Sequence, residues 1–216
     1  MKKVLASMLV ALSLSSICVA ADTSAVTPYA NTALQDGIHQ GNGSVATTIA
    51  VIPYVNASEE HKGYVADTVA TDYTNYFATM GYTIVSQDMV SKSLENAGYS
   101  SDNEELPEKE QMAAVAKDTK ADYVVAMIID ELHASRHESF FQTKVTVKTK
   151  LSYAVYSAKA DKIYKFKSTS SDDNKTSFGG VGYKTPIVNV LTNSMEQSNS
   201  KILAFIAENN NVEIKQ

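Results

Sequence analysis

The sequence predicts a single α/β domain built on a mixed β-sheet, and three patterns support this fold class. Residues 121–129 form a short, β-branched apolar run that suits a central strand buried on both faces. Strand-like and helix-like segments alternate through the first half of the domain, which is typical of β-α-β units with parallel strands. The second half changes to alternating polar and apolar residues, which indicates an antiparallel hairpin, and a C-terminal helix follows to pack on the sheet.

The first 21 residues have the layout of a secretory signal peptide. Two lysines precede an apolar run over residues 4–17, and small residues follow at 19–21. Cys18 follows Ile17 rather than Gly, Ala or Ser, so lipid attachment at this cysteine is the less favoured alternative. We therefore expect a periplasmic or secreted protein. Its mature chain should lack a transmembrane helix, because no later segment reaches the roughly 18 to 20 apolar residues required.

The mature chain is expected to be acidic and free of thiols. Removing the signal peptide leaves 17 basic and 24 acidic residues, a net charge near −7 with the histidines neutral. This balance argues against general nucleic-acid binding. Since Cys18 is the only cysteine, its removal also excludes disulfides, cysteine-ligated zinc and a cysteine nucleophile.

The expected organisation has three parts after the signal peptide. Residues 22–45 are polar and lack any period, so they are predicted to form a flexible leader. Residues 46–208 form the α/β domain, and residues 209–216 form a tail. The domain should begin with a buried strand over residues 46–54, because Pro53 lies where that strand must give way to a loop.

The segments that follow predict three helices and two further strands. Ser58, ahead of two glutamates, is a predicted N-cap, and apolar residues recur at steps of three and four from 64 to 80. A strand over 82–85 and a helix from 87 to 97 come next. Pro107 suits the first position of a helix that leads into the central strand. That strand should stop at Asp130 and Glu131, and the strands near residues 50, 84 and 125 should be mainly parallel.

The second half predicts a hairpin and a last helix. Residues 142–156 alternate between an apolar and a polar face, and residues 163–168 do so again after a turn. Residues 168–177 are polar and are predicted to form a loop. In the last helix Thr185 is the predicted N-cap and Pro186 the first residue, and the chain leaves the helix at the asparagines that begin at 209.

His133 and His137 are the candidate metal ligands. A spacing of four places both on one side of a helix or a strand, with Glu131 and Glu138 nearby as oxygen ligands. The glutamate placement of a His-Glu-x-x-His motif is absent, however, and the pair lies where the central strand is expected to meet a loop. Solvated histidines are the favoured interpretation, and no metal site is predicted.

No other motif predicts catalysis or a cofactor. Residues 179–185 are rich in glycine, but Tyr183 separates the last glycine from Lys184 and Thr185, so a phosphate-binding loop is less favoured than a surface turn. No Gly-x-Ser-x-Gly elbow is present. Asp130 and Glu131 are adjacent on a strand and should therefore point to opposite faces. We accordingly expect no catalytic residue and no cofactor.

Five lysines form a basic stripe in an otherwise acidic chain. They are expected on one face of the hairpin: Lys144, Lys148, Lys150, Lys165 and Lys167. The favoured interpretation is a solubilising face whose lysines discourage edge-to-edge aggregation. The alternative is a binding site for an anionic partner.

Three short segments resemble a known family. They are residues 48–54 (TIAVIPY), residues 81–85 with Met89, Val90 and Leu94 after them, and residues 120–126 (KADYVVA). The chain is similar to the TolB N-terminal domain and to the CsgG family of curli secretion proteins, which includes related envelope proteins such as LpoB. The resemblance spans residues 46–206 in order of elements. It implies an extracytoplasmic α/β domain without catalysis, acting in envelope assembly or secretion.

Two function hypotheses follow, together with a third alternative. The leading one is a non-catalytic interaction module of the cell envelope whose partner is a protein or an anionic envelope component. Nothing in the sequence argues against an oligomer. The competing hypothesis is a metal-dependent hydrolase that uses His133 and His137. The third is a periplasmic protein that binds a small ligand.

Overall fold

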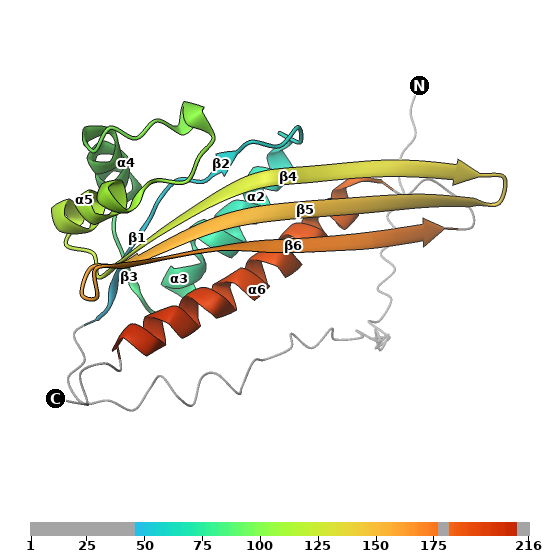
Figure 1. Ribbon diagram of the computed structural model, residues 1–216. Helices are drawn as coiled ribbons and strands as arrows, with labels where there is room; N and C mark the ends of the chain where they lie inside the picture. Colours follow the sequence, from blue (N-terminus) through green and yellow to red (C-terminus); the bar gives the residue numbers. More distant parts are fainter. Residues whose placement is uncertain (1–45, 177–181, 211–216) are drawn as a thin grey trace, which may run out of the picture. The chain divides into compact units, whose positions relative to one another are not determined.

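The computed structural model describes residues 46–176 and 182–210, and the predicted signal peptide and leader lie outside these residues. The described residues form a mixed six-stranded open sheet with helices on both faces (Figure 1). The strand order is β3-β1-β4-β5-β6, with β2 also paired to β4. The strands are β1 (Thr48–Val51), β2 (Val55–Asn56), β3 (Thr83–Ile84), β4 (Tyr123–Ser139), β5 (Gln142–Ser157) and β6 (Lys162–Thr176). The predicted α/β fold class is confirmed.

Parallel and antiparallel pairing divide the sheet as the sequence predicts. β1 pairs in parallel with both β3 and β4. β4, β5 and β6 are antiparallel neighbours. As expected, the strand gives way to Pro53, which follows the Ile52 N–H bond to the Val125 carbonyl, but the chain resumes pairing with β4 at Val55.

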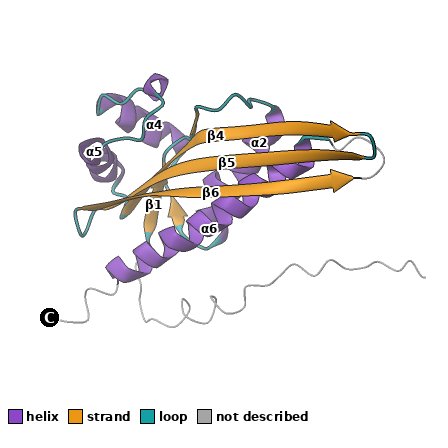
Figure 2. Cartoon of the chain, turned by 45° about the vertical axis from the view of Figure 1, so that its right-hand side comes forward, coloured by secondary structure: helices purple, strands orange, loops and turns teal. Residues whose placement is uncertain are grey.

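The helices cover the two faces unequally (Figure 2). Their bounds are α2 (Gly63–Val69), the π turn η1 (Ala70–Thr74), α3 (Tyr76–Thr79), α4 (Gln87–Asn96), the short η2 (Ser101–Asn103), α5 (Lys109–Thr119) and α6 (Lys184–Asn210). α6 runs along one face together with α2, η1 and α3, and α4 and α5 lie against the other face at the end that carries β1. The outer part of the long β4–β5–β6 unit therefore has helix on one side only.

The predicted helix over residues 64–80 contains a π turn. Val65, Val69, Tyr73 and Phe77 are all buried, although steps of four would drift around a regular helix of 3.6 residues per turn. The π turn, marked by the Asn75 N–H bond to the Ala70 carbonyl, adds a residue and returns the later side chains to the buried face. The Asp72 carbonyl accepts a hydrogen bond of 2.8 Å from the buried Asn199 of α6. A side chain of another helix thus contacts the backbone at the π turn.

The central strand does not stop at Asp130 and Glu131, as the sequence predicted. β4 continues to Ser139, and its pairing with β5 shifts by one residue between Ile129 and Glu131, which marks a β-bulge at Asp130. The Asp130 carboxylate accepts a hydrogen bond of 2.6 Å from Ser152. The extra residue reverses the alternation, so Ile129 and Leu132 both face the α6 side. The strand persists because β5 offers a backbone partner for every residue beyond the bulge.

The prediction of a loop over residues 168–177 is also wrong for residues 168–176, which belong to β6. β6 pairs with β5 in one unbroken register, from Ser157 opposite Lys162 to Thr143 opposite Thr176. Polar residues are tolerated there because the segment is an edge strand that is half exposed. The solvent-exposed face predicted for β5 likewise holds only for its outer half. Ala154 and Tyr156 are buried against residues of α4 and α5, and Ser152 is buried beside Asp130.

Three predicted helix starts differ in detail. Ser58 caps no helix; its hydroxyl donates to the Asn56 side chain in the loop before α2. α5 begins at Lys109 rather than at Pro107, and Glu108 is its N-cap, because the side chains of Glu108 and Gln111 form a capping box. α6 already begins at Lys184, so Thr185 and Pro186 lie inside its first turn.

Candidate functional site

The outer half of the β4–β5–β6 unit has one face that none of the described helices covers, here called the open face (Figure 1). The pairing registers place twelve polar side chains on it: Glu131, His133, Ser135, His137, Lys144, Thr146, Lys148, Lys150, Thr169, Ser171, Asp173 and Lys175. The opposite face of the same strands carries Leu132, Val145 and Val147, which are buried against the α6 side. One face is thus fixed in the core, and the other is left for solvent or a partner.

The structure brings the five predicted lysines onto one face. Lys144, Lys148 and Lys150 lie on the open face, and Lys165 and Lys167 continue it toward the inner half, opposite Ala154 and Ser152. The basic stripe is therefore continuous across two strands.

Acidic side chains neutralise two members of the stripe. Lys144 forms an ion pair of 2.9 Å with Asp173, and Lys165 forms one of 3.3 Å with Glu108. Hydrogen bonds from Thr146 and from Lys144 hold the pKa of Asp173 below its ordinary value. In the part of the chain that the structure describes, Lys148, Lys150 and Lys167 have no ion-pair partner. Within the stripe, these three side chains therefore keep their positive charge available to a partner.

A shallow groove of about 260 Å³ adjoins two of these lysines. Its lining combines ammonium groups, hydroxyl groups and one carboxylate: Glu131, Lys148, Thr149, Lys150, Thr169, Ser170 and Ser171. Ammonium and hydroxyl groups donate hydrogen bonds to anionic oxygens, whereas Glu131 opposes an anion close to it. The groove thus suits an acidic partner that presents its charge on the β6 side.

His133 and His137 both lie on the open face, opposite Lys148 and Lys144. Four residues of extended strand separate them, which places their backbones roughly 13 Å apart. Zinc accepts imidazole nitrogens at about 2.0–2.1 Å, so one ion cannot reach both side chains. Glu131 shares their face and Glu138 points to the other. Among residues 46–176 and 182–210, no group of three His, Cys, Asp or Glu side chains is placed to hold a metal ion.

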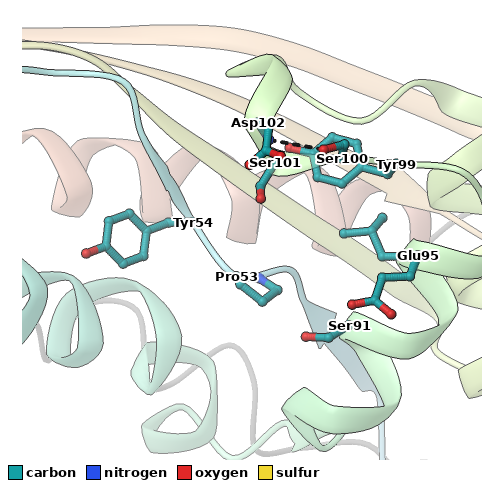
Figure 3. Close-up of a pocket in the computed structure, with 9 residues that line it drawn as sticks. Pro53, Tyr54, Ser91, Glu95, Tyr99, Ser100, Ser101 and Asp102 are labelled. Atoms are coloured by element: carbon teal, nitrogen blue, oxygen red, sulfur yellow. Dashed lines mark hydrogen bonds between the residues drawn. The ribbon is translucent and has the colours of Figure 1, made fainter.

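A cleft of about 350 Å³ lies on the opposite part of the domain (Figure 3). Its lining comes from the loop after β1, from α4 and from the segment around η2: Pro53, Tyr54, Ser91, Leu94, Glu95, Tyr99, Ser100, Ser101 and Asp102. Figure 3 shows the Ser100–Asp102 segment at the top, Ser91 and Glu95 at the lower right, and Pro53 to the left of Ser91. The cleft combines hydroxyl and carboxylate groups with aromatic rings.

The position of this cleft follows from strand order. The chain leaves β1 for β3 on one side and later returns to β4 on the other side, so β1 lies at a topological switch point of the parallel strands. Ligands of open α/β sheets bind outside the carboxyl ends of strands at such points. This cleft could not be predicted from the sequence, because strand order cannot be derived from the segments alone.

A second feature that sequence analysis missed is the β4–β5 turn. Phe140 and Phe141 form it and are 94% and 72% exposed. A signal was present in the sequence, since two aromatic residues stand between two alternating segments where turn residues are expected. The glycine-rich segment considered above lies outside the described residues over positions 179–181.

No protein-family model matches the chain, and no curated protein matches it. Among solved structures it is similar to lipoprotein GNA1162 from Neisseria meningitidis (13% identity, TM-score 0.41, covering 70% of this chain and 99% of that one). It is also similar to the LpoB C-terminal domain from Salmonella enterica (16% identity, TM-score 0.37, covering 63% of this chain and 92% of that one). A third similar structure is that of the hypothetical protein CT253 from Chlamydia trachomatis (11% identity, TM-score 0.45, covering 75% of this chain and 96% of that one).

LpoB is one of the proteins named in the sequence resemblance, whereas membership of the TolB or CsgG families stays a prediction. At these identities and TM-scores the likenesses carry no argument about function, which must come from this chain's own residues. Within the described residues, no helix has the length and apolar composition needed to cross a membrane.

Proposed function

We propose that the chain is a non-catalytic, extracytoplasmic interaction module that binds an acidic protein or another anionic envelope component on the open face. One observation carries the proposal: Lys148 and Lys150 on the open face, with Lys167 next to them at its inner end, form a cationic field without ion-pair partners in the described chain. Elsewhere the chain is acidic overall. A local field of opposite sign steers an acidic partner to this face and fixes its orientation.

The geometry of the sheet supports this role. Lys148 and Lys150 are two residues apart on β5, so their side chains share one face at a spacing of about 6 to 7 Å. Hydroxyl groups of Thr169 and Ser171 on β6 lie opposite them in the register. Acidic groups on a partner would therefore meet both charge and hydrogen-bond donors. Such contacts should weaken with salt, since exposed charges are screened over about 8 Å at physiological ionic strength.

The test compares two double variants with the same change of charge. Lys148→Glu with Lys150→Glu reverses the open face, and Lys92→Glu with Lys117→Glu reverses two exposed lysines on α4 and α5. We expect the wild type and the control pair to recover one partner from envelope extract, with binding that falls as salt rises. The open-face pair should lose that partner. Equal binding by both pairs across the salt series would place the interaction elsewhere on the chain.

The cleft near β1 favours a second candidate function, the binding of a small ligand. Its place at the switch point and its mixture of hydroxyl, carboxylate and aromatic groups are the supporting observations. Native mass spectrometry of the chain purified under mild conditions should then detect a bound small molecule. Ser91→Trp should abolish it by filling the cleft. A spectrum of the wild type without any adduct would count against this function.

A further inference from the structure

The turn between β4 and β5 presents two bulky apolar side chains to solvent. Phe140 is 94% exposed and Phe141 is 72% exposed. Their ring centroids are 4.8 Å apart at an interplanar angle of 79°, so they contact each other edge to face. The Ser139 hydroxyl donates a hydrogen bond of 2.9 Å to the Gln142 carbonyl and closes the turn beneath them. The two rings form an ordered apolar tip, here called the Phe tip.

The Phe tip contradicts the usual chemistry of a turn. Tight hairpin turns favour Gly, Asn and Asp, mostly at positive φ. Phe140 and Phe141 both keep φ outside the positive region, so the turn is neither type I′ nor type II′. Exposed phenylalanine contributes nothing to the core while it costs solvation. The turn thus departs both from the usual residue preferences of tight turns and from the burial of large apolar side chains. Such departures are expected at functional contacts.

The Phe tip also lies at the far end of the longest strands. Eight residues separate Glu131 from Ser139, which carries the turn about 26 Å beyond the bulge. Figures 1 and 2 show the β4–β5 turn at the end of the sheet opposite α4 and α5. The tip can therefore contact a surface while α4 and α5 stay away from it.

The surroundings of the tip change from apolar to polar within one residue. Ser139 and Gln142 flank the two rings, and Thr143 and Lys144 follow on β5. Large aromatic side chains bury roughly 150 to 250 Å² each, so the pair offers about 300 to 500 Å². A specific protein interface needs more than about 1,000 Å² in total. The tip alone is therefore too small for a protein partner, but a fluid lipid interface accepts a two-residue wedge with a polar collar at headgroup level.

We infer that Phe140 and Phe141 insert into the interfacial layer of a lipid bilayer and hold the outer end of the hairpin against the membrane surface. Burying two phenylalanines gains less free energy than burying a single myristoyl chain, which itself gives only marginal binding. The contact is accordingly weak and reversible, and it orients the domain rather than anchoring it. The open face then extends from the membrane surface toward α4 and α5.

The chain lacks tryptophan, which allows a single fluorescent reporter. We would replace Phe140→Trp in one variant and Met89→Trp in another. Met89 on α4 is 52% exposed and distant from the tip, so it is a matched control on the same chain. The probes are vesicles of phosphatidylcholine, alone or mixed with phosphatidylglycerol. We expect vesicles to shift the emission of Trp at position 140 to shorter wavelength, with quenching by lipids brominated near the headgroup, and to leave position 89 unchanged.

A sedimentation assay supplies the second readout. Phe140→Ser with Phe141→Ser should reduce the fraction of chain bound to vesicles by about tenfold or more, whereas Met89→Ser should leave it unchanged. Circular dichroism and a urea transition confirm that the variants fold. The inference is overturned if neither vesicle type alters the emission at position 140. It is equally overturned if that emission shifts without vesicles as protein concentration and molecular mass rise, because the tip would then be buried in a second copy of the chain.

Discussion

The hydroxyl group of Tyr73 in the π turn lies 2.8 Å from the carbonyl oxygen of Ile52, to which it donates a hydrogen bond. The same hydroxyl lies 3.1 Å from the carbonyl oxygen of Val125 on β4. Tyr73 thus connects a helical segment to two neighbouring strands at the point where Pro53 interrupts the ladder. Desolvation in this buried site raises the pKa of Tyr73 well above its ordinary value, so the hydroxyl remains a donor at all physiological pH values.

Tyr73→Phe should therefore destabilise the domain by about 1 to 3 kcal/mol, because it leaves the buried Ile52 carbonyl without this donor. Tyr153 provides the matched control. Its ring centroid lies 6.3 Å from that of Tyr73, but its buried hydroxyl has no hydrogen-bond partner among the described residues, and the Ser198 hydroxyl donates to the Ser194 carbonyl. Tyr153→Phe should be neutral or stabilising. Urea unfolding measures both, and equal losses would show that the Tyr73 bonds contribute nothing specific.

The Asp173 carboxyl group should titrate below its ordinary pKa because Thr146 and then Lys144 donate hydrogen bonds to its charged form. A carboxyl whose pKa is lower in the folded state stabilises the fold above its unfolded pKa of about 3.9. That contribution is lost as pH falls through the lower folded value. Carbon-detected NMR titration should show Asp173 returning toward the ordinary value in Thr146→Val. Asp161, whose pKa is lowered by Lys109 and Tyr156, should not move.

Export makes a prediction about the N-terminus. If the signal peptide is of the ordinary type, mass spectrometry should find Ala21 or Asp22 as the first residue, and cell fractionation should recover the chain without detergent. A diacylated Cys18 would reverse this prediction and place the N-terminus on a membrane. Cys18→Ser distinguishes the two routes, because it alters the product only if lipid is attached.

The competing hydrolase hypothesis is tested by elemental analysis. An extended strand holds His133 and His137 roughly 13 Å apart, so we expect purified chain to contain less than stoichiometric zinc after dialysis. His133→Ala and His137→Ala should leave the metal content unchanged. Stoichiometric zinc that disappears in His133→Ala would overturn the interaction-module proposal and favour metal-dependent chemistry.

Sequence reasoning predicts the parts of this fold that depend on local patterns. The apolar run at 121–129 indicates a doubly buried strand, and the structure covers both its faces with helices. Alternation along β5 predicts that Lys148 and Lys150 share a face, as the register confirms. These features follow from side-chain geometry within one segment, so they need no knowledge of strand order.

Features that depend on distant segments are not predicted. The polar stretch 168–176 has the composition of a loop, and it becomes a strand because β5 supplies a complete ladder of partners. Glu108, the acidic partner of Lys165, lies 57 residues earlier on a different element. The bulge at Asp130 likewise becomes visible only when β4 and β5 are aligned. Long-range pairing decides each of these, and local residue patterns do not record it.

Because the β-bulge at Asp130 is the one irregularity in the β4–β5 pairing, the length of the outer hairpin can change without changing which face each side chain occupies. Beyond the bulge, β4 and β5 pair without further irregularity from Glu131 opposite Lys150 to Ser139 opposite Gln142. Inserting or deleting residues two at a time in each strand would preserve which side chains face α6 and would keep Phe140 and Phe141 at the turn. Each such step would move the turn by about 6 to 7 Å relative to the helices. Changes of length in this hairpin should therefore be tolerated in even numbers and should set the distance between the Phe tip and the body of the domain.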